Sequence, residues 1–193
     1  SMYQFIAEQL EKRKVIENLV NLVNEARGKV KKIIYVPFEA FEPGFPEIDP
    51  EGPGMGGLRG LEIDMPTGWT LDGKPVKGAW VAGTPGPEII PELTPKKGDI
   101  IVRGKKTLDA FWSTALDYIL RVNMIEWVAI VGFHTNWCVE STARSAYDKG
   151  YRVIVISDCT GTDTDEEQNY AEKYIFPKIG SVMKYRDFLA SLT

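Results

Sequence analysis

Apolar residues recur at helical spacing near the N-terminus, and a short run of consecutive apolar residues follows them. Within residues 10–26 the apolar positions fall three or four residues apart, and Gly28 provides a stop signal. Residues 33–36 are β-branched or aromatic at every position, as in a strand that is buried on both faces. These patterns predict an amphipathic helix followed by a strand, which begins an α/β arrangement.

Strand and helix patterns alternate from residue 98 to the C-terminus. The predicted strands are 100–103, 127–131, 152–157 and 181–184, and the predicted helices are 109–122, 138–149, 165–174 and 186–192. Right-handed crossovers between parallel strands place helices on both faces of a sheet. The alternation therefore predicts a three-layer α/β/α fold with a mostly parallel, Rossmann-like sheet. In such sheets the chemistry gathers in the loops that follow the strands.

The segment between these two regions, residues 41–98, resists long regular elements. It holds ten of the twelve prolines and twelve of the eighteen glycines. Asp72-Gly73 between two short apolar runs predicts a small hairpin. We interpret the segment as an excursion from a single domain that spans residues 1–193. A loop region this long is commonly functional, as a lid or binding wall, and the alternative is a surface insertion or oligomer contact.

Composition and charge narrow the classes of partner. With 44% hydrophobic and 26% charged residues, the 193-residue chain resembles a soluble globular protein, and its net charge of −4 comes with scattered basic residues. This pattern favours a small-molecule substrate and argues against nucleic acid or an anionic membrane as partner. Neither a membrane span nor a signal peptide is recognisable, so we expect a cytoplasmic protein. Two cysteines and one histidine predict neither a disulfide framework nor a metal site.

One junction between a predicted strand and a predicted helix carries candidate chemistry. Cys138 falls at the first turn of the helix, where unpaired backbone N–H groups and the helix dipole favour a thiolate. The same N–H groups can stabilise the oxyanion that forms when a thiolate adds to a carbonyl carbon. The alternative for an isolated cysteine in such a position is a buried structural thiol.

Two sequence blocks resemble a known family. Residues 132–151, GFHTNWCVESTARSAYDKGY, are similar to the nucleophile motif of the isochorismatase-like cysteine hydrolases, and residues 155–160, VISDCT, to the strand that follows it. Residues 105–114, KKTLDAFWST, resemble the family's lysine motif, in which a lysine precedes an Ala-Phe pair by five residues. Counting back from Ala110 gives Lys105. The resemblance extends from about residue 10 to the C-terminus.

The resemblance implies a triad of Asp, Lys and Cys, with Cys138 as nucleophile and Lys105 lowering the thiol pKa. It also implies a cis peptide bond between Phe133 and His134, which turns the backbone N–H of His134 toward the oxyanion beside the N–H of Cys138. The His134 side chain would then line the pocket wall. Cys159 is expected to be a core or pocket-lining thiol. No cofactor is implied, and oligomers such as dimers or tetramers of the same chain are usual.

The chain departs from the family pattern at its beginning. In relatives the first strand lies in the middle of the sheet and ends in the catalytic aspartate, whereas no such strand precedes Leu10 here. Glu39 and Asp109 are possible substitutes for this acid/base, although solvated or helix-capping roles suit them as well. Loss of a central strand predicts unpaired strand edges and an apolar gap. Closure of the remaining strands, exchange of an N-terminal arm, or a segment that the given sequence omits would each repair it.

Three functional hypotheses follow from these observations. The first is a cysteine hydrolase that cleaves a C–N bond of a small amide or ureido compound through a covalent intermediate on Cys138. The second is a catalytically impaired binding protein that keeps the fold but lacks the aspartate. The third is a redox-sensing thiol protein, which the wide spacing of Cys138 and Cys159 disfavours. Vinyl-ether chemistry and the zinc-assisted nicotinamidase branch are less favoured, the latter because its histidine motif has no match.

Overall fold

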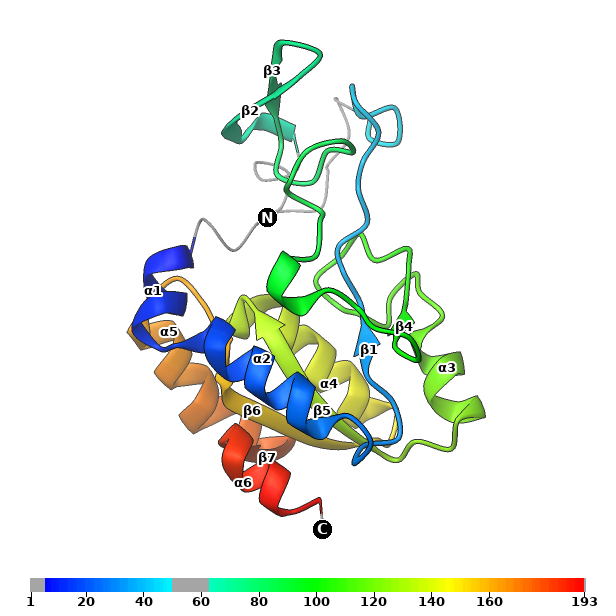
Figure 1. Cartoon of the computed structure of the whole chain (residues 1–193), viewed down its shortest axis with the longest axis vertical. Coiled ribbons are helices and arrows are strands. Elements are labelled where there is room, and N and C mark those ends of the chain that lie inside the picture. Colours follow the sequence, from blue (N-terminus) through cyan, green and yellow to red (C-terminus); the bar gives the residue numbers. More distant parts are fainter. Residues whose placement is uncertain (1–5, 50–62, 193) are drawn as a thin grey trace.

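Two separate pieces of parallel sheet form the centre of the computed structural model, which describes residues 6–49 and 63–192. The larger piece consists of β5 (Trp127–Phe133), β6 (Arg152–Gly161) and β7 (Gly180–Met183), paired in parallel in that order. The smaller piece pairs β1 (Ile34–Tyr35) with β4 (Ile100–Ile101), also in parallel. Figure 1 shows helices on both sides of these strands. The predicted α/β class with parallel strands is confirmed.

The alternation of side chains along β6 explains the layering. Val153 and Val155 pack in one apolar cluster, and Ile154 and Ile156 pack in another on the opposite face. The first cluster includes residues of α4 (Glu140–Asp148), and the second joins α2 (Val15–Ala26) to α6 (Tyr185–Ala190). A strand buried on both faces therefore separates two helical layers.

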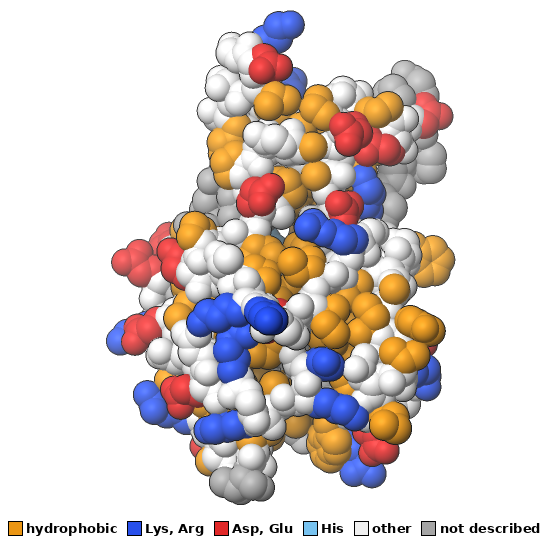
Figure 2. Space-filling model, turned by 45° about the vertical axis from the view of Figure 1, so that its right-hand side comes forward, with side chains coloured by type: hydrophobic (Ala, Val, Ile, Leu, Met, Phe, Trp, Pro, Cys, Tyr) orange, Lys and Arg blue, Asp and Glu red, His pale blue; other side chains and the backbone are white. Residues whose placement is uncertain are grey.

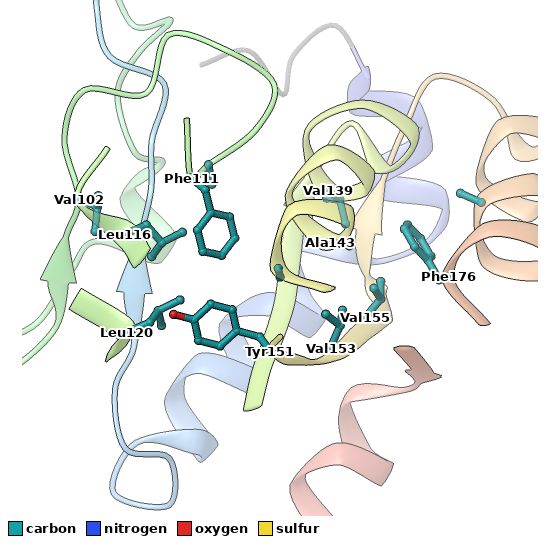
Figure 3. Close-up of a cluster of buried hydrophobic side chains, with 13 residues drawn as sticks. Val102, Phe111, Leu116, Leu120, Val139, Ala143, Tyr151, Val153, Val155 and Phe176 are labelled. Carbon is teal, nitrogen blue, oxygen red and sulfur yellow. The ribbon is translucent and has the colours of Figure 1, made fainter. Parts of the chain in front are cut away.

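The first of these clusters holds the two pieces of sheet together. Figure 3 shows its side chains converging from α3 (Leu116–Val122), the loop before it, α4 and β6. Phe111 and Tyr151 stack with their ring centroids 5.9 Å apart. Half-buried apolar residues of both sheet pieces border the same cluster: Ile34, Val36, Ile100, Val128 and Ile130.

Two predicted helices are interrupted in the structure. The helix predicted over residues 10–26 is divided into α1 (Ala7–Lys12) and α2, because Lys14 adopts a left-handed conformation with φ of 54°. The helix predicted over residues 109–122 is wrong in its first half, since α3 begins only at Leu116. Ser113, with φ of 58°, interrupts the helical backbone there, and an L-residue in that region cannot continue a right-handed helix.

The other predicted helices are present in the structure, with small differences in their bounds and in the type of helix. The segment predicted over 165–174 forms α5 (Asp165–Tyr170) and then η6 (Ala171–Ile175), a π-helical turn. The short η7 (Phe176–Lys178) leads into β7.

The described part of the excursion contains the predicted hairpin. β2 (Pro66–Leu71) and β3 (Lys74–Lys77) pair antiparallel, and Figure 1 shows them projecting from one end of the molecule. Asp72 and Gly73 both have positive φ, at 51° and 76°, which is the requirement of a two-residue type I′ turn. The rest of the described excursion contains η4 (Pro91–Leu93), which lies beside α2, and much irregular backbone. The suggested roles of the excursion, as a lid or as an oligomer contact, stay predictions.

An aromatic cluster fixes the excursion to the body of the protein. The Phe41 N–H donates to the Trp80 carbonyl at 2.7 Å, and the rings of Phe38 and Trp80 stack with centroids 3.9 Å apart. Phe41 and Trp80 are buried, whereas Phe38 is half-buried. The excursion therefore returns to the chain that leaves β1, which brings its aromatic residues near the carboxyl ends of β1 and β4.

The gap expected in the middle of the sheet is visible in the described residues. Every residue of β5 is exposed or half-buried, whereas β6 beside it is buried at eight of ten positions. Within residues 6–49 and 63–192, no strand joins β5 to the β1–β4 pair. Closure of the remaining strands into one sheet is therefore wrong, and the other two explanations stay predictions.

Large apolar side chains lie at the surface around α3. Trp112, Tyr118, Val122 and Met124 are each more than half exposed. Figure 2 brings this side of the molecule forward and shows apolar side chains among scattered Lys and Arg. Among the described helices, none combines the length and the apolar character that a bilayer crossing requires.

Candidate active site

Lys105 and Cys138 meet at the carboxyl ends of the two sheet pieces. Lys105 lies four residues after β4, and Cys138 lies in η5 (Thr135–Val139), the π-helical turn between β5 and α4. The Lys105 Nζ lies 3.7 Å from the Cys138 Sγ. The two residues that the motifs single out are thus in contact, although 33 positions separate them.

The backbone before Cys138 makes a sharp change of direction. Gly132 has φ of 132°, and His134 adopts φ of 57° and ψ of 74°. The His134 carbonyl then accepts hydrogen bonds from the N–H groups of Trp137, at 3.0 Å, and Val139, at 3.3 Å. Single π-helical turns are rare and often occur at functional sites. This turn sets Cys138 at the beginning of the helical segment that α4 continues, as the sequence predicted.

The cis peptide bond expected between Phe133 and His134 is wrong, since no described peptide bond is cis. The left-handed conformation of His134 makes the turn instead. It costs about 1–2 kcal/mol for an L-residue, against about 3–4 kcal/mol for a non-proline cis bond. The oxyanion roles of the N–H groups of His134 and Cys138 stay predictions.

Lys105 is a buried cation with few partners. Its side chain is almost inaccessible, at 5% exposure, and its Nζ donates to the Thr107 carbonyl at 2.6 Å. The same nitrogen lies 4.8 Å from the centre of the Phe38 ring. Burial lowers the pKa of Lys105 below its ordinary value, while the neighbouring Cys138 opposes this shift. Lys105 is therefore not a solvated surface residue.

The electrostatic environment of Cys138 differs from the expectation in its net direction. Burial raises the pKa of the Cys138 thiol, and the ammonium group of Lys105 lowers it by a smaller amount. Lys105 thus acts in the expected sense without reversing the effect of burial. The Cys138 residue is half-buried, so it is not sealed in the interior.

The two substitute carboxylates are engaged elsewhere. Glu39 accepts from the Gly104 N–H at 3.0 Å, and its own N–H donates to the Lys105 carbonyl at 2.6 Å. Asp109 accepts from the Phe111 N–H at 2.9 Å and from the Ser145 hydroxyl at 2.7 Å. In the described parts of the chain, neither carboxylate bonds to the Lys105 Nζ or the Cys138 Sγ. Their role as acid/base stays a prediction.

His134 and Cys159 occupy different environments. The His134 ring lies 5.7 Å from the Trp137 ring, and its Nδ1 is 3.7 Å from Asp163. Burial lowers the pKa of His134, against the opposing effect of Asp163. A role in the pocket wall stays a prediction. Cys159 is fully buried and burial raises its pKa, which confirms the expectation of a core thiol.

Sequence reasoning missed the residues of neighbouring elements that form hydrogen bonds to η5. Gln168 is buried in α5 and bonds to Thr135 in η5. Its place in an ordinary amphipathic helix gave no sign of this contact. Asn136 in η5 accepts a hydrogen bond from the Thr162 hydroxyl at 2.5 Å and donates one to Glu167 at 3.3 Å. Among the described residues, no three His, Cys, Asp or Glu side chains gather as metal ligands would.

Comparisons with known proteins show the family of the chain. A family model described as "Isochorismatase domain" matches residues 2–187. The uncharacterized isochorismatase family protein YwoC of Bacillus subtilis is 33% identical over 177 residues, which cover 91% of this chain and 82% of that protein. The ureidoacrylate amidohydrolase RutB of Klebsiella pneumoniae is 33% identical over 153 residues, which cover 77% of this chain and 60% of RutB.

A solved structure extends the similarity to three dimensions. An isochorismatase family protein from Burkholderia thailandensis superposes with a TM-score of 0.64 at 30% sequence identity. The match covers 92% of this chain and 82% of that one.

Proposed function

Because the chain belongs to the isochorismatase family, we propose that it hydrolyses a C–N bond of a small amide or ureido compound through a covalent intermediate on Cys138. The observation that carries this proposal is the 3.7 Å contact between the Lys105 Nζ and the Cys138 Sγ. It unites residues from two separate motifs at the edge of the sheet where such folds place their chemistry. The similarity to a ureidoacrylate amidohydrolase supports the class of bond.

The proposed reaction has two steps. In the first, the Sγ attacks the carbonyl carbon, the C–N bond breaks, and the nitrogen leaves as ammonia or an amine with the proton that the thiol gave up. In the second, water attacks the resulting thioester, which releases the acid and returns a proton to sulfur. The ammonium of Lys105 stabilises the negative charge on sulfur, and the N–H groups of Cys138 and His134 are proposed to bind the oxyanion.

The proton transfers in both steps require an acid/base group, which typically contributes 100- to 10,000-fold to the rate. Glu39 and Asp109 are our candidates in this chain. A change of either to its amide tests this assignment, because an amide preserves most hydrogen bonds and cannot take up the proton.

The decisive experiment is replacement of Cys138 by Ala, with Cys159→Ala as the matched control. Ammonia release from a panel of primary amides, carbamoyl amines and ureido acids is measured for the three proteins. We expect turnover by the wild type and the Cys159 variant and none by the Cys138 variant. Mass spectrometry of the wild type after a brief reaction should show the acyl group on the peptide that contains Cys138. Equal turnover by the Cys138 variant would disprove the proposal.

A catalytically impaired binding protein is the second candidate, and two observations favour it. Burial raises the pKa of Cys138, and the hydrogen bonds of the Glu39 and Asp109 carboxylates go to groups other than the sulfur and the Lys105 ammonium. The rate of Cys138 alkylation by iodoacetamide against pH separates the two functions. No turnover of the panel, together with an alkylation midpoint at or above that of an ordinary thiol, would support the binding protein.

A further inference from the structure

Buried polar side chains form a hydrogen-bonded row that begins in the nucleophile turn, the η5 residues 135–139. The Thr135 hydroxyl donates to the Gln168 Oε1 at 2.6 Å. The Gln168 Nε2 donates to the Thr160 hydroxyl at 3.0 Å and to the Glu172 carboxylate at 2.7 Å. Thr135, Thr160 and Gln168 are each at most 1% exposed. Buried polar groups of this kind are costly unless every partner is present, so the row specifies one arrangement.

The chemistry of the row fixes the direction of each hydrogen bond. A carboxylate only accepts, so Glu172 must face the NH₂ group of Gln168, and the amide oxygen must face Thr135. The Thr135 hydroxyl is thereby obliged to donate. Thr160 can accept from Gln168 because its own hydrogen is directed to the Ser157 carbonyl at 3.2 Å. The orientation of Gln168 is therefore determined by its neighbours.

Glu172, at the far end of the row, forms an ion pair with an arginine in the turn between α1 and α2. The Arg13 Nη2 lies 2.9 Å from the Glu172 carboxylate, and both side chains are about one-fifth exposed. This ion pair holds Glu172 in place, and it connects the turn between α1 and α2 to η6. The row thus runs from the N-terminal helices through α5 and η6 to the turn that carries the nucleophile.

Thr135 is the first residue of η5, three positions before Cys138. The turn follows a left-handed His134 and has π-helical geometry, which is less stable than an ordinary helical turn. The Sγ must nevertheless remain 3.7 Å from an ammonium group on a different sheet piece. The contact between Thr135 and Gln168 is the one buried hydrogen bond between side chains that joins η5 to α5 in the described residues.

We propose that Gln168 is a positioning residue, which holds the nucleophile turn through the Thr135 hydroxyl and so keeps the Cys138 sulfur beside Lys105. The proposal rests on the proposed function for its effect on turnover, but its effect on thiol reactivity is independent of any substrate. Gln168 touches neither the substrate nor the sulfur. It acts by restricting the turn to one conformation.

The test compares Thr135→Val, which removes the donor, with Thr135→Ser, which keeps it. Thr84→Val is the matched control, because Thr84 is also buried and its hydroxyl also makes one hydrogen bond, to the Val81 carbonyl at 2.7 Å in the excursion. Gln168→Met removes the acceptor from the other side with little change in side-chain length. Three quantities are measured: melting temperature, alkylation of Cys138 against pH by peptide mass spectrometry, and kcat and KM for the best amide.

We expect Thr135→Val and Gln168→Met to lower kcat by about 100-fold with KM nearly unchanged, since a displacement of about 1 Å has this effect. Their alkylation midpoints should rise, because the sulfur moves away from the Lys105 ammonium. Thr135→Ser should restore both values, and Thr84→Val should change only the melting temperature.

Two results would overturn the proposal. One is a wild-type alkylation profile in the folded Thr135→Val and Gln168→Met proteins. The other is the same change of profile in Thr84→Val, which would show a general effect of lost stability. If the wild type turns over none of the substrates, the proposed function fails, while the alkylation profiles still decide whether Gln168 positions the turn.

Discussion

Replacement of Lys105 by Met separates the chemical role of this side chain from its effect on stability. Methionine has a similar length and fits the apolar surroundings, but it carries no charge. At 3.7 Å, two unit charges attract by about 4 kcal/mol at an effective dielectric constant of 20. Burial of the ammonium offsets part of this gain. We therefore expect kcat to fall by about 100- to 1,000-fold, because a loss of about 2.7–4 kcal/mol of stabilisation of the charge on sulfur corresponds to this factor.

The stability of this variant should change in the opposite sense. Folding lowers the pKa of Lys105, so the unfolded chain holds this proton more tightly. The free energy of unfolding then rises with pH between the folded pKa and the ordinary value of 10.5, and the full cost is present below that range. Methionine removes this cost. The melting temperature at neutral pH should stay the same or rise, although the bond to the Thr107 carbonyl is lost.

The assay measures ammonia release and thermal unfolding on the same samples, together with alkylation of Cys138 against pH, whose midpoint should move upward. Lys106→Met is the matched control. The Lys106 side chain is one-third exposed and bonds to the Ala40 carbonyl and Glu47, so its loss should change kcat by less than about threefold. Activity of the Lys105 variant within tenfold of the wild type would refute the reasoning. An equal loss in the Lys106 variant would do the same.

Two further predictions concern the fold. Phe176→Ala should lower the free energy of unfolding by about 3–5 kcal/mol and the melting temperature by about 6–20 °C, because this ring is fully buried, whereas Tyr174→Ala at a half-exposed site should change it by less than about 2 °C. Asp99→Asn should cost about 1.5–3 kcal/mol at pH 7, since hydrogen bonds from Arg27 lower the pKa of Asp99. That stability is present above pH 3.8 and lost as the pH falls through the lower folded value, so urea unfolding should show the difference between the wild type and Asp99→Asn shrinking as the pH falls below 3.8. A stability difference that does not change with pH would contradict the pairing of Asp99 with Arg27.

The sequence predicted those elements whose signals are local. The hairpin followed from Asp72-Gly73, because only certain residues accept positive φ at both positions of a tight turn. The buried strand β6 followed from its uninterrupted apolar run, because a strand covered on both faces has no polar side. Proximity of Lys105 and Cys138 followed from the resemblance of their motifs, and local patterns alone would not have revealed it.

Features that depend on tertiary contacts were missed or wrong. The helix over residues 109–122 had adequate periodicity, but Asp109 bonds to Ser145 in α4 and the backbone there turns at Ser113. The raised pKa of Cys138 depends on how deeply the surrounding elements cover it, which a motif does not specify. Gln168 is separated from Thr135 by 33 positions, so no periodicity could have paired them.

The division of the sheet has a mechanical consequence for activity. In the part of the chain that the structure describes, no ladder of backbone hydrogen bonds joins the strand before Lys105 to the strand before Cys138. Their spacing is set by side-chain contacts, which include the apolar cluster and the hydrogen bond between Ser145 and Asp109, rather than by backbone pairing. Moderate heat or hydrostatic pressure would loosen those contacts first, so the reactivity of the sulfur should decline while β5, β6 and β7 still hold their pairing.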